Sequence, residues 1–452
     1  MNQQLSPLTL YSHSPLSPLK TMRRNKVDII SLGCSKNLVD SEHLIRQLHA
    51  AGYTVEHNPD RVDAEIVVVN TCGFIADAQE ESINTILELG EAKRQGKIRK
   101  LMVMGCLSER FMADLIEELP EVDRFYGKFN WKQMLGDLGK SYRDDLASDR
   151  ILTTPPHYAY MKISEGCNRF CAFCAIPLIT GRHKSIPIEQ LLDETRNLVT
   201  RGVKEFNVIA QDLSSYGLDL TGKMMLPELV KQMAAIDGVE WIRLHYAYPT
   251  QFPWDIMPVM AQHDNVCNYL DIALQHISDK VLGNMRRHIT RDETLRLIER
   301  MRREVPNLHL RTTLMVGFPG EGDKEFDELM DFVREVRFER MGAFAYSEEA
   351  GTWAAGNLSD DIPQDVKQSR LEALMDLQES ISMEIQESKV GTTQRVIIDR
   401  EEEEFYVGRT QYDSPEVDPE VLIDKKTPLT IGDFHDVDIT SALPFELMAT
   451  LH

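Results

Sequence analysis

The chain has no long hydrophobic run. None of its 452 residues lies in a stretch close to the roughly 18 consecutive apolar residues that a membrane-spanning helix needs. A hydrophobic secretory segment is also missing near the start of the sequence. These two absences argue against a membrane partner and against secretion, so we expect a cytoplasmic protein.

Positive charge is scarce as well. The chain carries 50 Lys and Arg against 72 Asp and Glu, which gives a formal net charge of −22. Such a protein repels a nucleic-acid backbone unless it carries a local basic patch. Nucleic acid is therefore not expected as the substrate, and a basic protein suits this charge better as a partner.

Cysteine is also scarce, with only seven residues in the chain. An odd number of cysteines without a secretory segment does not suit a disulfide framework. In the reducing cytoplasm, thiols serve more often as metal ligands. The spacing of the cysteines therefore bears directly on function.

Three of the cysteines form a compact array. Cys167, Cys171 and Cys174 follow a strand-like run over residues 158–164, with the spacing C-x3-C-x2-C. Four cysteines normally close a cubane iron–sulfur cluster, so three local thiolates would leave one iron open for an exchangeable ligand. A structural zinc site wants four ligands, commonly in C-x2-C pairs, and this spacing argues against it. The alternative is three buried thiols with a structural role.

Three further cysteines follow three apolar segments in the N-terminal part of the chain. Each lies just beyond a predicted strand and before a helical pattern: Cys34 after residues 27–32, Cys72 after 64–69 and Cys106 after 100–104. This alternation predicts an α/β domain with a doubly wound parallel sheet over residues 25–140. Because such sheets build sites at the carboxyl ends of their strands, we predict a second three-cysteine cluster. Three unrelated buried cysteines are the alternative, and no G-x-G-x-x-G motif supports a dinucleotide fold.

A longer series of strands and amphipathic helices occupies residues 153–385. The six predicted strands cover residues 158–164, 205–210, 241–245, 269–273, 309–316 and 342–345. Six such units predict a partial (β/α)6 barrel, in which the loops after the strands carry the chemistry. These loops hold the cysteine array and Gln211. The helix over residues 371–388 is expected to be a linker, and Cys267 an ordinary buried thiol.

Both ends of the chain differ from the middle in composition. Residues 1–24 are rich in Ser, Pro and Leu and are expected to be a disordered extension. Short strands separated by Pro, Gly and Asp turns predict a small β-barrel over residues 386–452. From Glu387 onward this tail has fifteen acidic and six basic side chains, including the run 401–404, and so a net charge of −9. That sign disfavours RNA, which needs a basic groove.

The segments around these cysteines resemble those of the radical S-adenosylmethionine methylthiotransferases. The similarity runs from about Lys26 to the C-terminus, and its matching segments are 31–42, 69–75, 164–168, 243–246, 317–321 and 413–418. Members that modify tRNA usually read Tyr-Gly-Cys-Gln-Met-Asn where this chain has Leu-Gly-Cys-Ser-Lys-Asn at 32–37. Within the family, the chain is therefore most similar to the members that modify ribosomal protein S12.

The resemblance implies a radical S-adenosylmethionine barrel, a TRAM-like tail barrel and S-adenosylmethionine as a cofactor. It also implies two 4Fe–4S clusters, a sulfur-delivering one on Cys34, Cys72 and Cys106 and an S-adenosylmethionine-binding one on Cys167, Cys171 and Cys174. An electron donor would reduce the latter, and the resulting 5′-deoxyadenosyl radical would prepare the β-carbon of an aspartate in S12 for methylthiolation. Gln211 and Arg311, at the second and fifth barrel strands, are the expected contacts to S-adenosylmethionine.

Two other functions stay open at this point. A tRNA methylthiotransferase would perform the same chemistry on nucleic acid, and the charge of the tail argues against it. A non-catalytic scaffold would use both cysteine trios as structural metal sites, which leaves the open iron positions without a purpose. Mass spectrometry of candidate substrates tests the first alternative, and iron and sulfide analysis tests the second.

Overall fold

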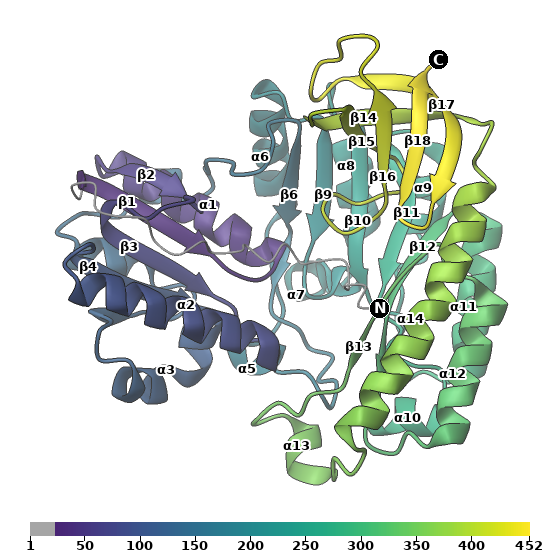
Figure 1. The fold of residues 1–452 in the computed structure, drawn as a ribbon, viewed down its shortest axis with the longest axis horizontal. Coiled ribbons are helices and arrows are strands. Elements are labelled where there is room, and N and C mark those ends of the chain that lie inside the picture. Colours follow the sequence, from purple (N-terminus) through teal and green to yellow (C-terminus); the bar gives the residue numbers. More distant parts are fainter. Residues whose placement is uncertain (1–22) are drawn as a thin grey trace.

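The computed structural model describes residues 23–452 (Figure 1). The expected disordered extension, residues 1–24, lies outside the described residues except for its last two. Arg23 and Arg24 begin strand β1 (Arg23–Ser31), so the expectation is wrong for them, since the backbone of Arg23 donates to the carbonyl of Asp63 beside β3. No helix among the described residues is long and apolar enough to cross a membrane.

The N-terminal domain is built on a parallel sheet with strand order β2-β1-β3-β4-β5. Its further strands are β2 (Thr54–His57), β3 (Ala64–Thr71), β4 (Lys100–Gly105) and β5 (Arg124–Phe125). The sequence predicts β1, β3 and β4 but not the two edge strands. Both edge strands are short and neither is fully buried, so they lack the apolar run that marks a strand in the sequence.

Helices cover both faces of this sheet. Helix α1 (Ser35–Ala50) packs on one face, and α2 (Ala76–Arg94) and α3 (Cys106–Glu118) pack on the other. Alternate residues of β3 point to opposite faces of the sheet. Ile66 and Val68 pack against α1, whereas Val67 and Val69 pack against α2 and α3. The predicted doubly wound α/β sheet is confirmed.

The central domain is an open barrel of six parallel strands in the order β13-β12-β11-β10-β9-β6. The strands are β6 (Tyr158–Lys162), β9 (Glu205–Ile209), β10 (Trp241–Ala247), β11 (Val266–Ile272), β12 (His309–Val316) and β13 (Arg340–Ala345). Its longer helices are α6 (Ile188–Thr200), α8 (Leu226–Ala234), α9 (Ile256–Gln262), α11 (Arg291–Glu304) and α12 (Asp323–Val336). The predicted partial barrel is confirmed, and the carboxyl ends of its strands point down in Figure 1.

Short elements fill the connections. They are α4 (Trp131–Asp137), η1 (Asp144–Leu146), β7 (Ser164–Glu165), α5 (Ile176–Ile179), β8 (Lys184–Ser185), η2 (Leu213–Ser215), α7 (Leu218–Thr221), α10 (Asp279–Asn284) and α13 (Trp353–Asn357). Strand β7 pairs with β8 and precedes the cysteine array directly. The short helix α5 follows the array, so both ends of the cysteine loop are held by regular structure.

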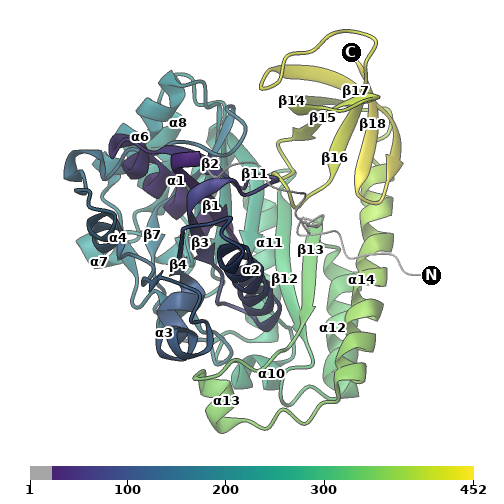
Figure 2. The ribbon, with the colours of Figure 1, turned by 60° about the vertical axis from the view of Figure 1, so that its left-hand side comes forward.

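Helix α14 (Gln364–Glu387) corrects the expectation of a linker over residues 371–388. It begins seven residues earlier than predicted and packs along β13 and α12 (Figure 2). Leu371, Leu374 and Ile381 are buried in the same core as the barrel strands. The helix is therefore part of the barrel domain as well as its connection to the tail.

The tail forms a closed five-stranded barrel in the order β14-β15-β16-β18-β17, as predicted. Its strands are β14 (Thr393–Glu401), β15 (Phe405–Thr410), β16 (Glu420–Asp424), β17 (Phe434–Leu443) and β18 (Glu446–Leu451). The sequence analysis missed β18, which closes the barrel by pairing with both β16 and β17. The tail covers the amino ends of the central strands, opposite the cysteine loop (Figure 1). Cys267 is fully buried at this junction with Trp241 and Ile397.

Candidate functional site

The first cysteine trio lies at the carboxyl edge of the N-terminal sheet. Cys34 directly precedes α1, Cys72 directly follows β3, and Cys106 is the first residue of α3. Strands β1 and β3 are neighbours whose following helices lie on opposite faces, which is where open α/β sheets form their sites. Cys34 and Cys72 lie close enough to Cys106 for a thiolate at either one to raise its pKa, so the structure brings the three side chains together.

Close backbone approach makes this convergence possible. A Cβ atom on Gly33 would lie 2.7 Å from the Cβ of Cys72, and one on Gly105 would lie 2.5 Å from the carbonyl oxygen of Thr71. Both glycines also have positive φ angles, 88° and 107°, which residues with a side chain rarely adopt. Larger residues at these positions would push the three cysteine loops apart.

Asn37, in the first turns of α1, ties the same loops to one another. Its amide nitrogen donates to the carbonyl oxygens of Leu32 at 3.1 Å and Thr71 at 2.9 Å. Its side-chain oxygen lies 3.4 Å from the sulfur of Cys106. The sequence analysis gave Asn37 no role, although its position three residues after Cys34 is a signal that could have found it.

The second trio occupies the loop between β7 and α5. The backbone N–H of Arg169 donates to the sulfur of Cys167 at 3.4 Å. The Nη1 of Arg287 donates to the sulfur of Cys171 at 3.2 Å, and the guanidinium lies 4.1 Å from the centre of the Tyr248 ring. Cys167 and Cys171 lie close enough to Cys174 for a thiolate at either one to raise its pKa, so these three side chains also converge.

Burial controls the protonation of these thiols. It raises the pKa of Cys72 and of Cys167 to about 12, and it raises the pKa of Cys106 and Cys174 further. Burial by itself therefore favours the thiol forms of these sulfurs. A cationic group bound between them would favour the thiolate forms, because nearby positive charge offsets the loss of solvation.

The two trios lie near each other across the junction of the N-terminal domain and the barrel. Cys106 shares a buried cluster with Ala175 and Ile179, and Ala175 follows Cys174 directly. Helices α3 and α5 are in contact at this point. The sequence-predicted ligands of both clusters thus come from opposite sides of one interface.

Neither trio suits a single metal ion. Among the described residues, the only three metal-ligating atoms within 4.8 Å of one another belong to Asp28, Glu56 and Asp63, and Lys26 pairs with all three. A zinc ion bound to sulfur at about 2.3 Å would hold any two sulfurs within about 4.6 Å. The sulfurs of each trio are too widely spread for that, and a larger group such as a four-iron cluster fits them better.

A buried ion network joins the two domains beside the trios. Lys128, after β5, pairs with Asp40 at 3.4 Å and with Glu165 at 3.2 Å. Lys162, in β6, pairs with the same two carboxylates. Lys128, Lys162 and Asp40 are buried, whereas Glu165, which precedes Gly166 of the cysteine array, is partly exposed. This network was not predicted, although a lysine within the apolar run 158–164 is a visible signal.

The two predicted contacts to S-adenosylmethionine lie in different places. Gln211, just after β9, donates from Nε2 to Glu165 at 3.0 Å, which places it beside the cysteine loop, and its buried Oε1 has no partner among the described residues. Arg311 lies nearer the tail, 3.3 Å from Asp418 and 3.9 Å from Asp271. Both assignments stay predictions.

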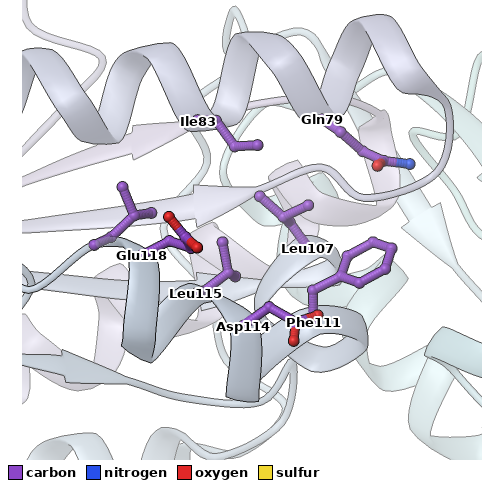
Figure 3. Close-up of a pocket in the computed structure, with 8 residues that line it drawn as sticks. Gln79, Ile83, Leu107, Phe111, Asp114, Leu115 and Glu118 are labelled. Carbon is purple, nitrogen blue, oxygen red and sulfur yellow. The ribbon is translucent and has the colours of Figure 1, made fainter.

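A separate apolar pocket of about 270 Å³ lies between α2 and α3 (Figure 3). Ile83, Leu107 and Phe111 point toward its centre, and α3 is kinked at Phe111. One of its lining residues, Leu107, follows Cys106 directly. Its lining offers no group of metal-ligating side chains, so the site of interest remains the interface between the two trios.

The chain is similar to known proteins in both sequence and structure. Residues 26–127 match the family described as Uncharacterized protein family UPF0004, residues 161–333 match the Radical SAM superfamily, and residues 390–451 match the TRAM domain. Among solved structures, the radical S-adenosylmethionine methyltransferase TsrM from Kitasatospora setae is similar with a TM-score of 0.53. It shares 14% identity, covering 71% of this chain and 72% of TsrM, so the likeness shows the fold.

Curated relatives are much more similar. The ribosomal protein uS12 methylthiotransferase RimO of Parabacteroides distasonis is 66% identical over 94% of this chain and 99% of its own length. The protein of the same name from Bacteroides thetaiotaomicron is 60% identical over 95% of this chain and 99% of its own length. S-adenosylmethionine and 4Fe–4S clusters, the predicted cofactors, are those of radical S-adenosylmethionine enzymes of this kind. The chain belongs to the family of ribosomal protein uS12 methylthiotransferases.

Proposed function

We propose that this protein transfers a methylthio group to the β-carbon of an aspartate in ribosomal protein uS12. The observation that carries the proposal is the meeting of two cysteine trios at one domain interface, with Cys106 packed beside the loop of the second trio. An enzyme that activates carbon and delivers sulfur needs both centres close to the same substrate atom. The near full-length similarity to proteins named for this activity supports the choice of substrate.

Six cysteines would hold the two clusters: Cys34, Cys72 and Cys106 the first, and Cys167, Cys171 and Cys174 the second. Bound there, the clusters and S-adenosylmethionine would supply electron transfer, the hydrogen-abstracting radical, sulfur and methyl group. The chain's own residues orient and shield these groups. Arg287 donates to Cys171, and its guanidinium packs on the Tyr248 ring, which fixes the orientation of the donor toward that sulfur.

Gln211 is the residue we propose to contact S-adenosylmethionine. Its Oε1 is buried without a partner among the described residues, and its Nε2 is held by Glu165. A buried carbonyl oxygen without a donor is costly, so a donor on a bound ligand would satisfy it. Arg311 already has Asp271 and Asp418 beside it, so its role toward S-adenosylmethionine is the weaker proposal.

The tail is proposed to help in docking the basic ribosomal protein. Some of its acidic residues are used internally, since Asp413 pairs with Arg340 and Asp399 with Arg409. The run 401–404 remains exposed. Exposed negative charge attracts a basic protein and repels naked RNA. A ribosomal substrate also implies action in the cytoplasm, where an electron donor must supply the reducing equivalents.

The test is anaerobic reconstitution with isolated uS12, S-adenosylmethionine, sulfide and a chemical reductant. The expected product is a uS12 peptide heavier by one methylthio group on an aspartate, with release of 5′-deoxyadenosine. A parallel reaction with bulk tRNA tests the nucleic-acid alternative. If tRNA but not uS12 were modified, tRNA and not uS12 would be the substrate. Bound zinc without release of 5′-deoxyadenosine would favour a metal-binding scaffold.

A further inference from the structure

Lys36 is a buried cation without an anionic partner. Its ammonium lies 3.1 Å from the centre of the Tyr246 ring, and the residue is only 8% exposed. It makes no side-chain hydrogen bond or ion pair with any residue from 23 to 452. A cation–π contact offsets part of the lost solvation, but a buried charge normally also needs an opposite charge.

The carboxylates near Lys36 are engaged elsewhere. Burial raises the pKa of Asp271, and Lys36 is close enough for its charge to lower that pKa in part. The Asp271 carboxylate, however, already lies 3.9 Å from Arg311 and 4.0 Å from His245. Asp40, one turn further along α1, pairs with Lys128 and Lys162. Among residues 23–452, Lys36 therefore has no carboxylate of its own to pair with.

The start of α1 adds positive potential of its own. Lys36 lies in the first turn of this helix, which contains no acidic residue, and the Cys34 side chain at the cap position forms no capping hydrogen bond. The free N–H groups of a helix start carry a partial positive charge that favours anions. Lys36 adds to this positive potential, and a negatively charged group of a bound molecule would neutralise it.

Lys36 also lies between the first trio and a strand of the barrel. It follows Cys34 by two residues and lies over Tyr246, near the carboxyl end of β10. Tyr246 has a φ angle of 66°, a strained conformation for a residue with a side chain and one that concentrates at functional sites. Buried polar atoms without partners among the described residues line this end of the barrel as well, including Gln211 Oε1 and Gln275 Oε1.

We propose that Lys36 binds the side-chain carboxylate of the aspartate to be modified, an inference that rests on the proposed function. The β-carbon of aspartate is bonded directly to the carboxylate carbon. A cation that fixes the carboxylate therefore also fixes the position of the reacting carbon, beside the first trio and at the mouth of the barrel. Lys36 is thus a specificity residue that distinguishes aspartate from its uncharged amide.

A different role would be to balance the negative charge of a cluster held by Cys34. The two roles differ in what they affect. Charge balance acts on iron content and reduction potential, whereas carboxylate binding acts on the choice between aspartate and asparagine. An experiment on the substrate side separates them.

The experiment uses the cluster-loaded full chain and two uS12 peptides that differ only in Asp or Asn at the modified position. We expect the wild type to bind the Asp peptide about 10- to 100-fold more tightly, as for a hydrogen bond to a charged group. Lys36→Met, which keeps the length of the side chain, should bind both peptides alike, while Lys36→Arg should retain the preference. Iron content and 5′-deoxyadenosine release without peptide should stay at wild-type levels in Lys36→Met.

Lys140→Met is the matched control, because Lys140 also contacts a tyrosine ring, that of Tyr53 at 5.2 Å, in the same domain. It should keep the wild-type preference. Equal binding of both peptides by the wild type, or an undiminished preference in Lys36→Met, would overturn the assignment of Lys36 alone. A wild type that binds the Asp peptide selectively but never methylthiolates it would instead contradict the proposed function and leave the carboxylate site standing.

Discussion

Lys128 and Glu165 belong to different domains, and their side chains meet with 3.2 Å between Nζ and Oε2. Lys162 pairs with the same carboxylate from β6. Because Glu165 is two residues before Cys167, these pairs connect the loop of the second trio to the N-terminal domain that carries the first. The distance between the two proposed clusters therefore depends on a buried set of charges.

Glu165→Gln should destabilise the protein. Burial alone would raise the pKa of Glu165, but Lys162 and Lys128 outweigh it and lower the pKa to about 2. Removing this carboxylate charge leaves two buried ammonium groups with Asp40 alone, which is expected to cost about 3 kcal/mol of unfolding free energy. Urea unfolding at neutral pH measures the change. Glu80→Gln, an exposed change on α2, is the control, and equal stability of the two variants would contradict the coupling.

Much of the fold could be predicted from the sequence, because buried parallel strands read as apolar runs. Strands β3 and β4 are of this kind. The edge strand β2 was missed because it is short, half polar and largely exposed, whereas the closing strand β18 was missed although most of its residues are apolar. The early start of α14 was missed for a related reason, as its first turns carry polar residues such as Gln364 and Asp365.

The cysteines of the candidate site could be predicted because three of them follow separate strand ends and the other three have the spacing C-x3-C-x2-C. Their polar surroundings could not, because they depend on contacts between distant segments. Lys128 and Asp40 are 88 positions apart, and nothing local marks them as partners. Arg311 of β12 is a second example, since nothing in the sequence marks its partner Asp418 of the tail, 3.3 Å away, and its contact to S-adenosylmethionine stays a prediction.

The junction between tail and barrel should weaken in acid. Burial raises the pKa of Asp399, but Arg409 and His157 outweigh it and lower it to about 2, from an ordinary value of 3.8. Because the pKa is lowered in the folded state, the ionised carboxylate adds about 2 kcal/mol to the free energy of unfolding. This contribution is complete above about pH 4 and is lost as the pH falls toward 2. Asp399→Asn should therefore be less stable than the wild type at pH 6, with a smaller gap at pH 3. Asp436→Asn, an exposed tail variant, should show no such pH-dependent gap in urea unfolding.

Iron content should report the two trios separately. The triple variant Cys34→Ala, Cys72→Ala and Cys106→Ala should keep about four of about eight irons per chain after anaerobic reconstitution, since one 4Fe–4S site remains. Cys267→Ala should keep all of them, because Cys267 is buried at the tail junction away from both trios. Iron and sulfide analysis gives both counts. A loss of iron in Cys267→Ala would contradict the assignment of ligands.

Association with isolated uS12 should depend on salt. Glu403 and Glu404 lie in the exposed run of the tail, and neither forms an ion pair with a described residue. Replacing both by Gln should weaken binding roughly twofold per charge at low ionic strength, with little effect at high salt. Titration calorimetry across salt concentrations measures this. The pair Glu80→Gln and Glu88→Gln on α2 is the control, and binding that ignores salt would count against docking through the tail.

The reduction potential of the second cluster should depend on Arg287. This residue is buried, and its Nη1 donates to the sulfur of Cys171 at 3.2 Å. A hydrogen bond and a positive charge at a ligand sulfur favour the more negative, reduced state of a cluster and so raise its potential. Arg287→Met should therefore lower the potential, on the order of 59 mV, which is a tenfold step for a one-electron couple.

Redox titration followed by electron paramagnetic resonance measures this shift, in a chain whose first trio is replaced by alanine so that one cluster contributes. The neighbouring Arg286→Met is the matched control, because the Arg286 guanidinium lies 3.6 Å from the centre of the Trp353 ring and contacts no cysteine. An unchanged or raised potential in Arg287→Met would show that the arginine serves only to pack against Tyr248. Arg287→Lys, which keeps the charge without the planar donor, should fall between the variant and the wild type, because charge and hydrogen bond then contribute separately.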